Sequence, residues 1–567
     1  MKKTQFAELW TQEGEVLQGQ PWTAYPRPHL QREEWLNLNG EWEFTVCDGA
    51  DLPDRYERRI RVPFPPESLL SGIHETFAEN TYLFYRRSFI LPEGFQKDRV
   101  LLHFGAVDQI AAVYLNGRRI GEHIGGYQHF TFDITDYLQA VNVLVVRVED
   151  HLSSRILPYG KQCRKRGGMW YTPVSGIWQT VWLESVPREY IESLHIETGT
   201  DFAQFHTQRL EGLVTIQTPE GMVEVPLKNG TTRVELKTPR LWSPEDPYLY
   251  RCIIRAGEDV VSTYFALRTL EIREVEGISR LCLNGKPYFF HGLLDQGYWS
   301  DGLFTPACPE CYAKDILEMK ALGFNTLRKH IKVEPEQFYY DCDRLGMIVF
   351  QDFVNNGDYS FLRDTALPTV GLKRLGDKYL HRDSKARSAF LVHLEETVEQ
   401  LRHHPCVCYW TIFNEGWGQF DSTAAYRHLK TLDPTRFVDS ASGWFTGGES
   451  DVESDHVYFK PFRSRKTKKP LVLSEFGGYA LKIEGHVFNP AKEYGYRHFE
   501  DRESFEKAFL ELYEKEIVPA IPEGLCAAVY TQVSDVEDET NGLVTYDRKV
   551  TKVNQEVMRK LAKKLKL

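Results

Sequence analysis

The C-terminal half of the chain, from about residue 273, alternates short apolar runs with longer amphipathic ones. Short apolar runs bounded by turn residues are typical of buried parallel strands, and amphipathic runs are typical of the helices that connect them. Strands are expected at 288–294, 325–328, 347–352, 407–414, 437–440, 456–460, 471–475 and 526–531. Helices are expected at 312–321, 336–344, 386–402 and 503–517. Eight strand–helix units in roughly 290 residues predict a (β/α)8 TIM barrel.

The N-terminal half has the pattern of all-β structure, because short alternating runs are separated by recurrent turn signals. Two of these signals, Asn39-Gly40 and Asn116-Gly117, are favoured in two-residue hairpins, where both central residues adopt positive φ. A chain of 567 residues exceeds a single core, so several domains are expected. We predict a jelly-roll β-sandwich over 1–187, an immunoglobulin-like β-sandwich over 188–272 and the barrel over 273–567.

The composition excludes some classes of partner. A net charge of −11 argues against nucleic acid and anionic membranes, which both favour a basic surface. The first eight residues include two lysines but no apolar core of a signal peptide, and no segment has the apolar length of a membrane span. A cytoplasmic protein with no nucleic-acid or membrane partner is therefore expected.

Ten cysteines are scattered along the chain, which fits reduced and mostly buried thiols. Cys308 and Cys311 have the spacing of redox and zinc sites. No second pair of that spacing and no nearby histidine cluster completes a zinc set. We therefore predict a packing role for this pair, and no metal or cofactor.

Two glutamates follow apolar runs at points where the chain turns into glycine. Glu415 lies in Asn414-Glu415-Gly416 after the fourth expected strand, and Glu475 ends the seventh. A carboxylate at the carboxyl end of a barrel strand is typical of a catalytic residue, and a pair of them is what glycosidic cleavage requires. Each alone is equally consistent with a surface glutamate at a strand end. The adjacent Asn414, the aromatic neighbours and the second copy favour catalysis.

Several runs in the N-terminal half and both glutamate motifs carry a family resemblance. The chain resembles glycoside hydrolase family 2, which includes β-galactosidases, β-glucuronidases and β-mannosidases. The resemblance spans nearly the whole length and rests on the runs at 35–42, 62–68, 113–117, 121–127, 132–135 and 175–184, together with Asn414-Glu415 and Ser474-Glu475-Phe476-Gly477.

The resemblance implies a role for each residue of the motifs. Glu415 would be the general acid/base, Glu475 the nucleophile, and Asn414 would hold the sugar 2-hydroxyl group. Two nearby carboxyl groups separate their pKa values, so that one is ionised while the other carries a proton. We expect a retaining double displacement with carboxyl groups about 5–5.5 Å apart, whereas an inverting enzyme holds them at about 6.5–9.5 Å.

Further candidates for substrate binding are polar and aromatic residues at the expected strand ends. Tyr458 matches a family tyrosine near the nucleophile, and Trp417 would either stack on a sugar face or belong to the core. The full set comprises Asp295, Gln296, Arg328, His330, Lys332, Trp417, Tyr458, Lys460 and Tyr530.

The sugar is the least constrained part of the prediction. After the first strand the chain has Leu294-Asp295-Gln296-Gly297 in place of the family's Asn-(Arg/Lys)-His-Glu, which puts the metal site of some galactosidases in doubt. The Asn-x-Lys motif with which β-glucuronidases bind a carboxylate is replaced by 540–543, Thr-Asn-Gly-Leu. A neutral, galactoside-like sugar is therefore the first choice, and a glucuronide or other acidic sugar is the alternative.

Three cations bear on that choice. His330, Lys332 and Lys460 would either bind an acidic substituent or pair with Asp295, Glu334 and Asp352, and internal pairing is favoured. The resemblance implies exo action on a terminal β-glycoside.

The rival class is a non-catalytic carbohydrate-binding protein with an idle barrel. Homo-oligomers are usual in the family. The loop at 163–169 would then either reach a neighbouring subunit's site or form a solvated turn, which is favoured.

Overall fold

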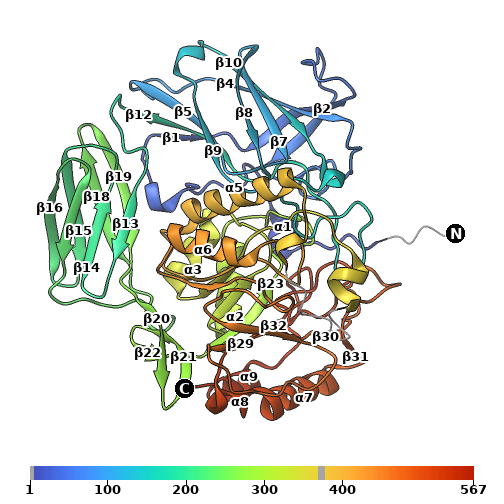
Figure 1. Ribbon diagram of the computed structural model, residues 1–567. Coiled ribbons are helices and arrows are strands. Elements are labelled where there is room, and N and C mark those ends of the chain that lie inside the picture. The colour runs from blue at the N-terminus through green and yellow to red at the C-terminus, as the bar shows by residue number, and fades with distance from the viewer. Residues whose placement is uncertain (1–5, 368–376, 567) are drawn as a thin grey trace.

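The computed structural model describes residues 6–367 and 377–566. Two β-sandwiches lie on adjacent sides of a parallel barrel, as Figure 1 shows. The multidomain architecture predicted from the sequence is therefore confirmed. Among the described residues, no helix combines the length and the apolar character that crossing a membrane requires.

The N-terminal sandwich packs a four-stranded sheet, β1-β12-β5-β9, against a six-stranded one, β3-β2-β4-β10-β7-β8. Buried side chains of both sheets, such as Trp42, Val113 and Leu183, form its core. Its strands are β1 (Trp35–Asn37), β2 (Gly40–Cys47), β3 (Arg58–Val62), β4 (Tyr82–Phe89), β5 (Arg99–Phe104), β6 (Val107–Asp108), β7 (Ile110–Leu115), β8 (Arg118–Ile124), β9 (Phe130–Asp133), β10 (Asn142–Glu149), β11 (Gly176–Ile177) and β12 (Val181–Val186).

The two Asn-Gly pairs differ in outcome. Asn116 and Gly117 have φ of +52° and +77° and join β7 to β8 as a two-residue hairpin, so this prediction is confirmed. The prediction for Asn39-Gly40 is wrong, because β1 pairs with β12 whereas β2 pairs with β3 and β4. The Asn39 side chain accepts a hydrogen bond from the backbone N–H of Val181, which holds the chain where it crosses between the two sheets.

The second sandwich is smaller. Its three-stranded sheet contains β13 (His195–Thr198), β14 (Phe202–His206) and β17 (Thr231–Glu235), and its four-stranded sheet contains β15 (Gly212–Thr218), β16 (Gly221–Leu227), β18 (Tyr250–Ala256) and β19 (Asp259–Phe265). A small sheet of β20 (Leu270–Val275), β21 (Ile278–Leu283) and β22 (Lys286–Pro287) leads from it to the barrel.

The barrel sheet has eight parallel strands in the order β27-β26-β25-β24-β23-β32-β29-β28. The strands are β23 (Phe290–Asp295), β24 (Thr326–Lys329), β25 (Ile348–Asp352), β26 (Val407–Thr411), β27 (Phe437–Asp439), β28 (Glu453–Val457), β29 (Leu471–Gly477) and β32 (Leu525–Thr531). Each overlaps an expected strand. The sixth lies earlier than predicted, because β28 pairs with β29 from Glu453 opposite Leu471 onward. Residues 458–460 therefore lie in the loop after the strand.

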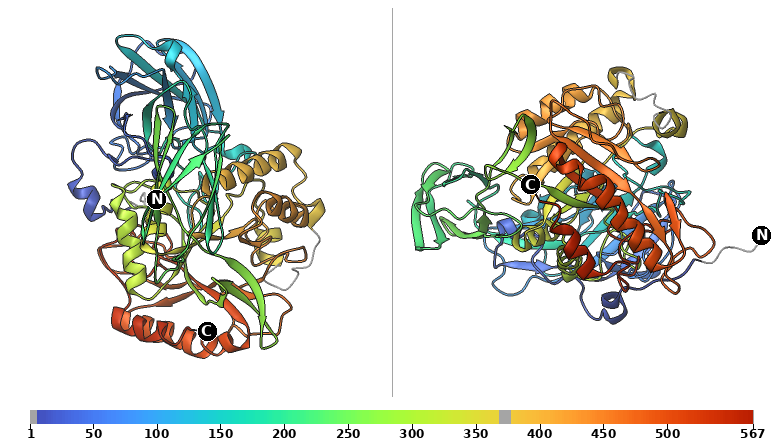
Figure 2. Two further views of the ribbon diagram at one scale, coloured as in Figure 1. Left: turned by 90° about the vertical axis from the view of Figure 1, so that its left-hand side faces the viewer. Right: turned by 90° about the horizontal axis from the view of Figure 1, so that it is seen from below.

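Helices cover the outside of the barrel. They are α2 (Glu310–Ala321), α3 (Glu336–Leu345), α5 (Ser384–Leu401), α6 (Ser422–Leu432), α7 (Arg502–Leu512), α8 (Ala520–Glu523) and α9 (Gln555–Ala562), with α1 (Gln12–Val16) in the N-terminal arm. Other elements among the described residues are short 3₁₀- or π-helices and one strand pair: η1 (Pro28–Leu30), η2 (Thr135–Tyr137), η3 (Leu152–Ser154), η4 (Phe361–Ala366), η5 (Asp377–Tyr379), η6 (Tyr513–Ile517), β30 (Tyr479–Leu481) and β31 (Arg497–Phe499). Figure 2 shows the C-terminal helices gathered at one end of the barrel.

All ten cysteines are free thiols. Cys311, at the start of α2, is buried in the barrel core, and its Sγ lies 3.6 Å from that of Cys308.

Candidate active site

The backbone holds Glu415 in an unusual conformation. Its φ is +50°, in the left-handed region that costs a side-chain-bearing residue of order 1–3 kcal/mol. Its N–H donates to the carbonyl of Ser442 at 2.9 Å, and the following Gly416 also has positive φ. The bend turns the chain immediately after β26, so that the Glu415 side chain is directed across the barrel. Strain of this kind is concentrated at functional sites.

Glu475 lies within β29, and its side chain faces that of Glu415. One carboxylate oxygen of each glutamate and one ring nitrogen of His456 all lie within 4.8 Å of one another. His456 Nδ1 is 2.7 Å from Glu415 Oε1, and Nε2 is 3.6 Å from Glu475 Oε1. The two side chains are 14% and 6% exposed, so the glutamates share one largely desolvated space.

A directional chain of hydrogen bonds fixes the tautomer of His456. The hydroxyl of Ser474 donates to the Asp455 carbonyl at 3.2 Å, and the hydroxyl of Ser442 donates to Ser474 at 3.0 Å. Ser442 Oγ must therefore accept from His456 Nε2–H at 2.8 Å. Nδ1 of the same ring lies 2.7 Å from Glu415 Oε1, so a hydrogen bond joins the ring to the carboxyl group.

The surroundings of Glu475 favour its ionised form. Arg328 donates to Oε1 at 2.9 Å, and the hydroxyl of Tyr458 donates to Oε2. Burial alone would raise the pKa of Glu475. Interactions with the His456 ring, the Arg328 guanidinium and the His330 ring, together with the Tyr458 hydrogen bond, outweigh it and lower the pKa to about 2.

Arg328 also orients Asn414. Its Nη2 donates to Asn414 Oδ1 at 2.9 Å, which leaves the amide N–H groups of Asn414 as donors to other partners. Its Nε donates to Asp352 Oδ1 at 2.9 Å, and Asp352 Oδ2 lies 2.8 Å from His330 Nδ1. Burial lowers the pKa of His330, so its ring is neutral near pH 7.

The structure thus brings Asn414, Arg328, His330 and Tyr458 together with both glutamates. Gln296 lies outside this hydrogen-bonded group, and its side-chain amide donates to Gln532 Oε1 at 2.6 Å.

Four predicted substrate contacts are not part of this cluster. Asp295 is paired with the buried Lys329 at 2.6 Å. Lys332 is buried and donates to Glu334 at 2.9 Å and to two backbone carbonyls, so it supports the loops below the site. Lys460 is exposed, because β28 ends earlier than predicted. Tyr530 is completely buried against Phe509 of α7, because its position in β32 directs it toward the helices.

Trp417 is only 2% exposed, and its ring stacks on Trp170 of the N-terminal sandwich at 5.3 Å. Of the two alternatives for Trp417, a core position is therefore the one observed, and Trp170 is the less buried ring of the pair. The rings of Tyr458 and Tyr496 stack on each other with their centres 3.9 Å apart, next to Glu475, which accepts the Tyr458 hydrogen bond.

Sequence reasoning missed the contribution of the N-terminal sandwich. Its loop between β10 and β11 carries Lys161 and Trp170 to the carboxyl ends of the barrel strands. In the same loop Arg166 pairs with Glu537 and Asp538 of this chain's own barrel, so it is not a solvated turn. The missed barrel residue is Glu539, which follows β32 by eight positions and has no strand-end signal.

Two groups among the described residues bring three ligand atoms close enough to hold a metal ion. They are Glu415, His456 and Glu475, and, at the junction of three chain segments, His29, Glu336 and His403. In the first group Arg328 already supplies the positive charge at Glu475, so a divalent cation there would be repelled.

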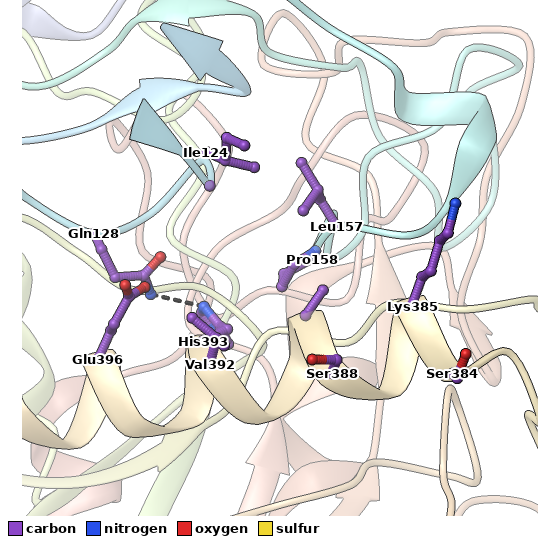
Figure 3. Close-up of a pocket in the computed structure, with 12 residues that line it drawn as sticks. Ile124, Gln128, Leu157, Pro158, Ser384, Lys385, Ser388, Val392, His393 and Glu396 are labelled. Atoms are coloured by element: carbon purple, nitrogen blue, oxygen red, sulfur yellow. Dashed lines mark hydrogen bonds between the residues drawn. The ribbon is translucent and has the colours of Figure 1, made fainter. Parts of the chain in front are cut away.

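A separate cavity of about 490 Å³ lies between the N-terminal sandwich and α5. Figure 3 shows Ile124 and Gln128 of the sandwich on one side and Ser388, His393 and Glu396 of α5 on the other. It contains neither member of the glutamate pair.

Comparison with known proteins agrees with this architecture. The model described as "Glycosyl hydrolases family 2, TIM barrel domain" matches residues 274–566, which is more than half of the chain. The model described as "Glycosyl hydrolase 2 galactose-binding domain-like" matches 71–168, and "Glycosyl hydrolases family 2" matches 195–268.

Related proteins have different substrates in their names. A β-galactosidase of Thermoanaerobacter pseudethanolicus is 26% identical over 424 residues, which cover 68% of this chain but 52% of that protein. A β-glucuronidase of Pongo abelii is 26% identical over 601 residues, which cover 89% of this chain and 87% of that protein.

Solved structures show the same fold at lower identity. A β-D-glucuronidase of Dictyoglomus thermophilum has a TM-score of 0.73 at 19% identity and covers 95% of this chain and 98% of its own. A β-galacturonidase of Eisenbergiella tayi has a TM-score of 0.68 at 18% identity and covers 96% of this chain and 98% of its own. With the three family models following one another along its length, the chain belongs to glycoside hydrolase family 2 and is a glycoside hydrolase.

Proposed function

We propose that the protein is a retaining, exo-acting β-glycosidase that releases a terminal neutral sugar, galactoside-like, by double displacement. The observation that carries this proposal is the approach of Glu415 and Glu475, whose nearest carboxylate oxygens lie within 4.8 Å. Such a separation leaves room for one anomeric carbon and matches the short spacing of retaining enzymes rather than the long spacing of inverting ones.

Glu475 is proposed as the nucleophile. Its low pKa keeps it ionised, and it attacks the anomeric carbon while the bond from that carbon to the leaving oxygen breaks. In the resulting glycosyl ester its charge is lost, which removes one negative charge from beside Glu415.

Glu415 is proposed as the general acid and then the general base. A proton from its hydrogen bond with His456 passes to the leaving oxygen. In the second step Glu415 accepts a proton from water, the water oxygen bonds to the anomeric carbon, and the ester bond to Glu475 breaks. Its 14% exposed side chain is the more accessible of the two, which suits contact with the leaving group and water.

One observation supports a neutral sugar. Arg328, His330 and Lys332 are occupied by Asp352, Glu475 and Glu334, so none of these cations is left to neutralise a substrate carboxylate. Asn414 Oδ1 accepts from Arg328, so its amide N–H groups are left to bind a 2-hydroxyl group, which neutral and acidic sugars share. The sandwich loop beside Trp417 supports exo action, because it covers one side of the site.

The primary test uses p-nitrophenyl β-glycosides of galactose, glucose, mannose, arabinose and glucuronate. We expect hydrolysis with retained configuration by the native enzyme. Glu475→Ala is expected to lower kcat by about 10⁴-fold or more. Added azide is then expected to yield a glycosyl azide of inverted configuration, because the anion occupies the vacated space. Glu484→Ala, an exposed position, is the control. An azide product of retained configuration would overturn the assignment of Glu475.

Glu415 is tested by varying the leaving group. Glu415→Ala is expected to reduce hydrolysis of alkyl glycosides far more than that of dinitrophenyl glycosides, because only the former need a proton to leave. Equal losses on both substrates would contradict the acid role.

A uronide is the second candidate, favoured by the β-glucuronidases and the β-galacturonidase among the related proteins. Faster hydrolysis of the p-nitrophenyl β-glucuronide or β-galacturonide than of every neutral glycoside would select it.

A further inference from the structure

Two oppositely charged side chains, Lys161 and Glu539, lie beside the glutamate pair without contacting each other at ion-pair distance. Lys161 is 7% exposed and Glu539 is 4% exposed. Lys161 has no carboxylate partner within 4.0 Å among the residues that the structure describes. Its Nζ instead lies 5.4 Å from the ring centre of Trp417 and 5.6 Å from that of Tyr171.

Glu539 accepts hydrogen bonds at one of its two carboxylate oxygens. Its Oε2 accepts from the hydroxyl of Tyr171 and, at 3.0 Å, from the amide of Gln532. Among the residues that the structure describes, none donates a hydrogen bond to its Oε1. Glu539 therefore has one oxygen held in place and one oxygen left for a ligand.

Glu539 lies within electrostatic range of Glu475, and Lys161 lies within electrostatic range of Glu539 and His330. Burial, together with the charge of Glu475, raises the pKa of Glu539, while the charge of Lys161 opposes that rise. The charge of Lys161 also acts on His330, which is bonded to Asp352 in the Arg328 network. Tyr171 links the two side chains, because its ring lies under Lys161 and its hydroxyl donates to Glu539, and both therefore lie close to the residues around Glu475.

The backbone around Lys161 is fixed against the barrel. Tyr159 N–H donates to the carbonyl of Asn355 at 3.0 Å, and its hydroxyl donates to the carbonyl of Gly357 at 2.9 Å. The carbonyl of Lys161 accepts from Tyr171 N–H at 3.0 Å. Lys161 is therefore held in position before any ligand binds.

A buried ammonium group without a counter-charge is costly, and the two aromatic faces recover only about 0.5–2 kcal/mol. Its three donors need acceptors, and the open oxygen of Glu539 needs a donor. A sugar hydroxyl group can both donate and accept, so a polyol placed between Lys161 and Glu539 satisfies both.

We propose that Lys161 and Glu539 determine sugar specificity: they bind hydroxyl groups of the terminal sugar away from the anomeric carbon, Lys161 as donor and Glu539 as acceptor. The carboxylate of Glu539 would repel a uronate carboxylate in this desolvated space, which excludes acidic sugars. This inference rests on the proposed function and extends it to the choice of sugar.

The test compares Lys161→Met and Glu539→Gln on the best neutral p-nitrophenyl glycoside and on the glucuronide. Each variant is expected to lower kcat/KM on the neutral substrate by about 10–100-fold, since a hydrogen bond to a charged group is worth about 1.5–3 kcal/mol. Glu539→Gln is also expected to raise the ratio of glucuronide to neutral activity by about tenfold or more. Lys165→Met, exposed in the same loop, and Glu484→Gln are controls that retain native kinetics.

Aryl glycosides that lack one hydroxyl group separate recognition from misfolding. The penalty of each variant is expected to disappear on the one deoxy substrate that lacks the hydroxyl group it binds, whereas a misfolded variant loses activity on all of them. Native-like kinetics of both variants would overturn the inference while leaving the proposed function intact. Native preference for the glucuronide that Lys161→Met abolishes would overturn it in favour of carboxylate binding. No hydrolysis of any glycoside by the native enzyme would overturn the proposed function, and this inference with it.

Discussion

At the scale of residues, the two carboxyl groups of the site differ in their hydrogen-bond partners. Glu475 accepts hydrogen bonds from an arginine and a phenol, whereas Glu415 is hydrogen-bonded to His456. The first arrangement stabilises a negative charge, and the second supplies the partner with which Glu415 exchanges a proton in the proposed reaction. This difference in partners, rather than the residue type, assigns the two glutamates their proposed roles.

The contribution of Tyr458 can be measured from the pH dependence of activity. Tyr458→Phe removes a hydrogen bond that lowers the pKa of Glu475, so this pKa is expected to rise from about 2 by up to about one unit. The acid limb of kcat/KM is expected to move to higher pH by the same amount. The stability that the ionised Glu475 contributes is present above its ordinary pKa and is lost as the pH falls through the folded value. Tyr114→Phe, in β7, is the control, and an unmoved acid limb would refute the assignment.

The residues that the sequence placed together, Asn414, Glu415 and Glu475, follow local motifs at strand ends. Tyr530 was placed wrongly because the face on which a strand residue projects depends on register, which the sequence pattern alone did not resolve. Lys161 and Glu539 were missed for a different reason. Each lies in a loop, and only long-range packing brings them to the barrel.

At the scale of elements, the alternation of apolar and amphipathic runs predicted all eight barrel strands, because parallel strands buried on both faces leave a strong hydrophobic signal. The loop between β10 and β11 has no such periodicity. Its position depends on contacts such as that of Gly160, which has φ of +65° and packs against the barrel loop after β24.

Gly160 offers a test of this loop. A Cβ at this position would lie 2.9 Å from the carbonyl oxygen of Ile331, so Gly160→Ala is expected to displace the loop and lower kcat/KM by about tenfold or more. Gly117→Ala is a matched control, because Gly117 has φ of +77° but open space around its Cα. Both variants share the backbone strain, of order 1 kcal/mol. Only the first is expected to change the kinetics, and equal effects of both would contradict the steric argument.

At the scale of the whole molecule, the N-terminal sandwich and the barrel meet through buried polar contacts. Val354 N–H donates to His393 Nε2 at 3.1 Å. The amide of Gln128 lies 2.7 Å from Nδ1 of the same ring, and Figure 3 shows this contact. Burial lowers the pKa of His393 to about 3. Protonating Nε2 would break the bond from Val354, so the junction requires the neutral ring.

Stability is therefore expected to fall with pH in a defined window. His393 has a lower pKa when folded than its ordinary value of about 6.5, so the unfolded chain binds an additional proton between these values. The free energy of unfolding is expected to decrease by about 1.4 kcal/mol per pH unit for this residue as the pH falls below 6.5. Melting temperatures measured from pH 7 to pH 4 are expected to fall less steeply for His393→Gln than for the native protein. His498→Gln, which is exposed, is expected to keep the native slope, and parallel slopes for all three proteins would contradict this account.

The loop of the sandwich pairs with barrel residues as many as 372 positions distant, at Arg166 and Asp538. The glutamates that we propose to break the glycosidic bond and the loop that carries Lys161 therefore lie in separate halves of the chain. Under the proposed function, exchange of that single loop between relatives is expected to alter substrate choice and to leave Glu415 and Glu475 in place. The catalytic barrel, by contrast, is expected to be incomplete whenever it is produced without its partner domain.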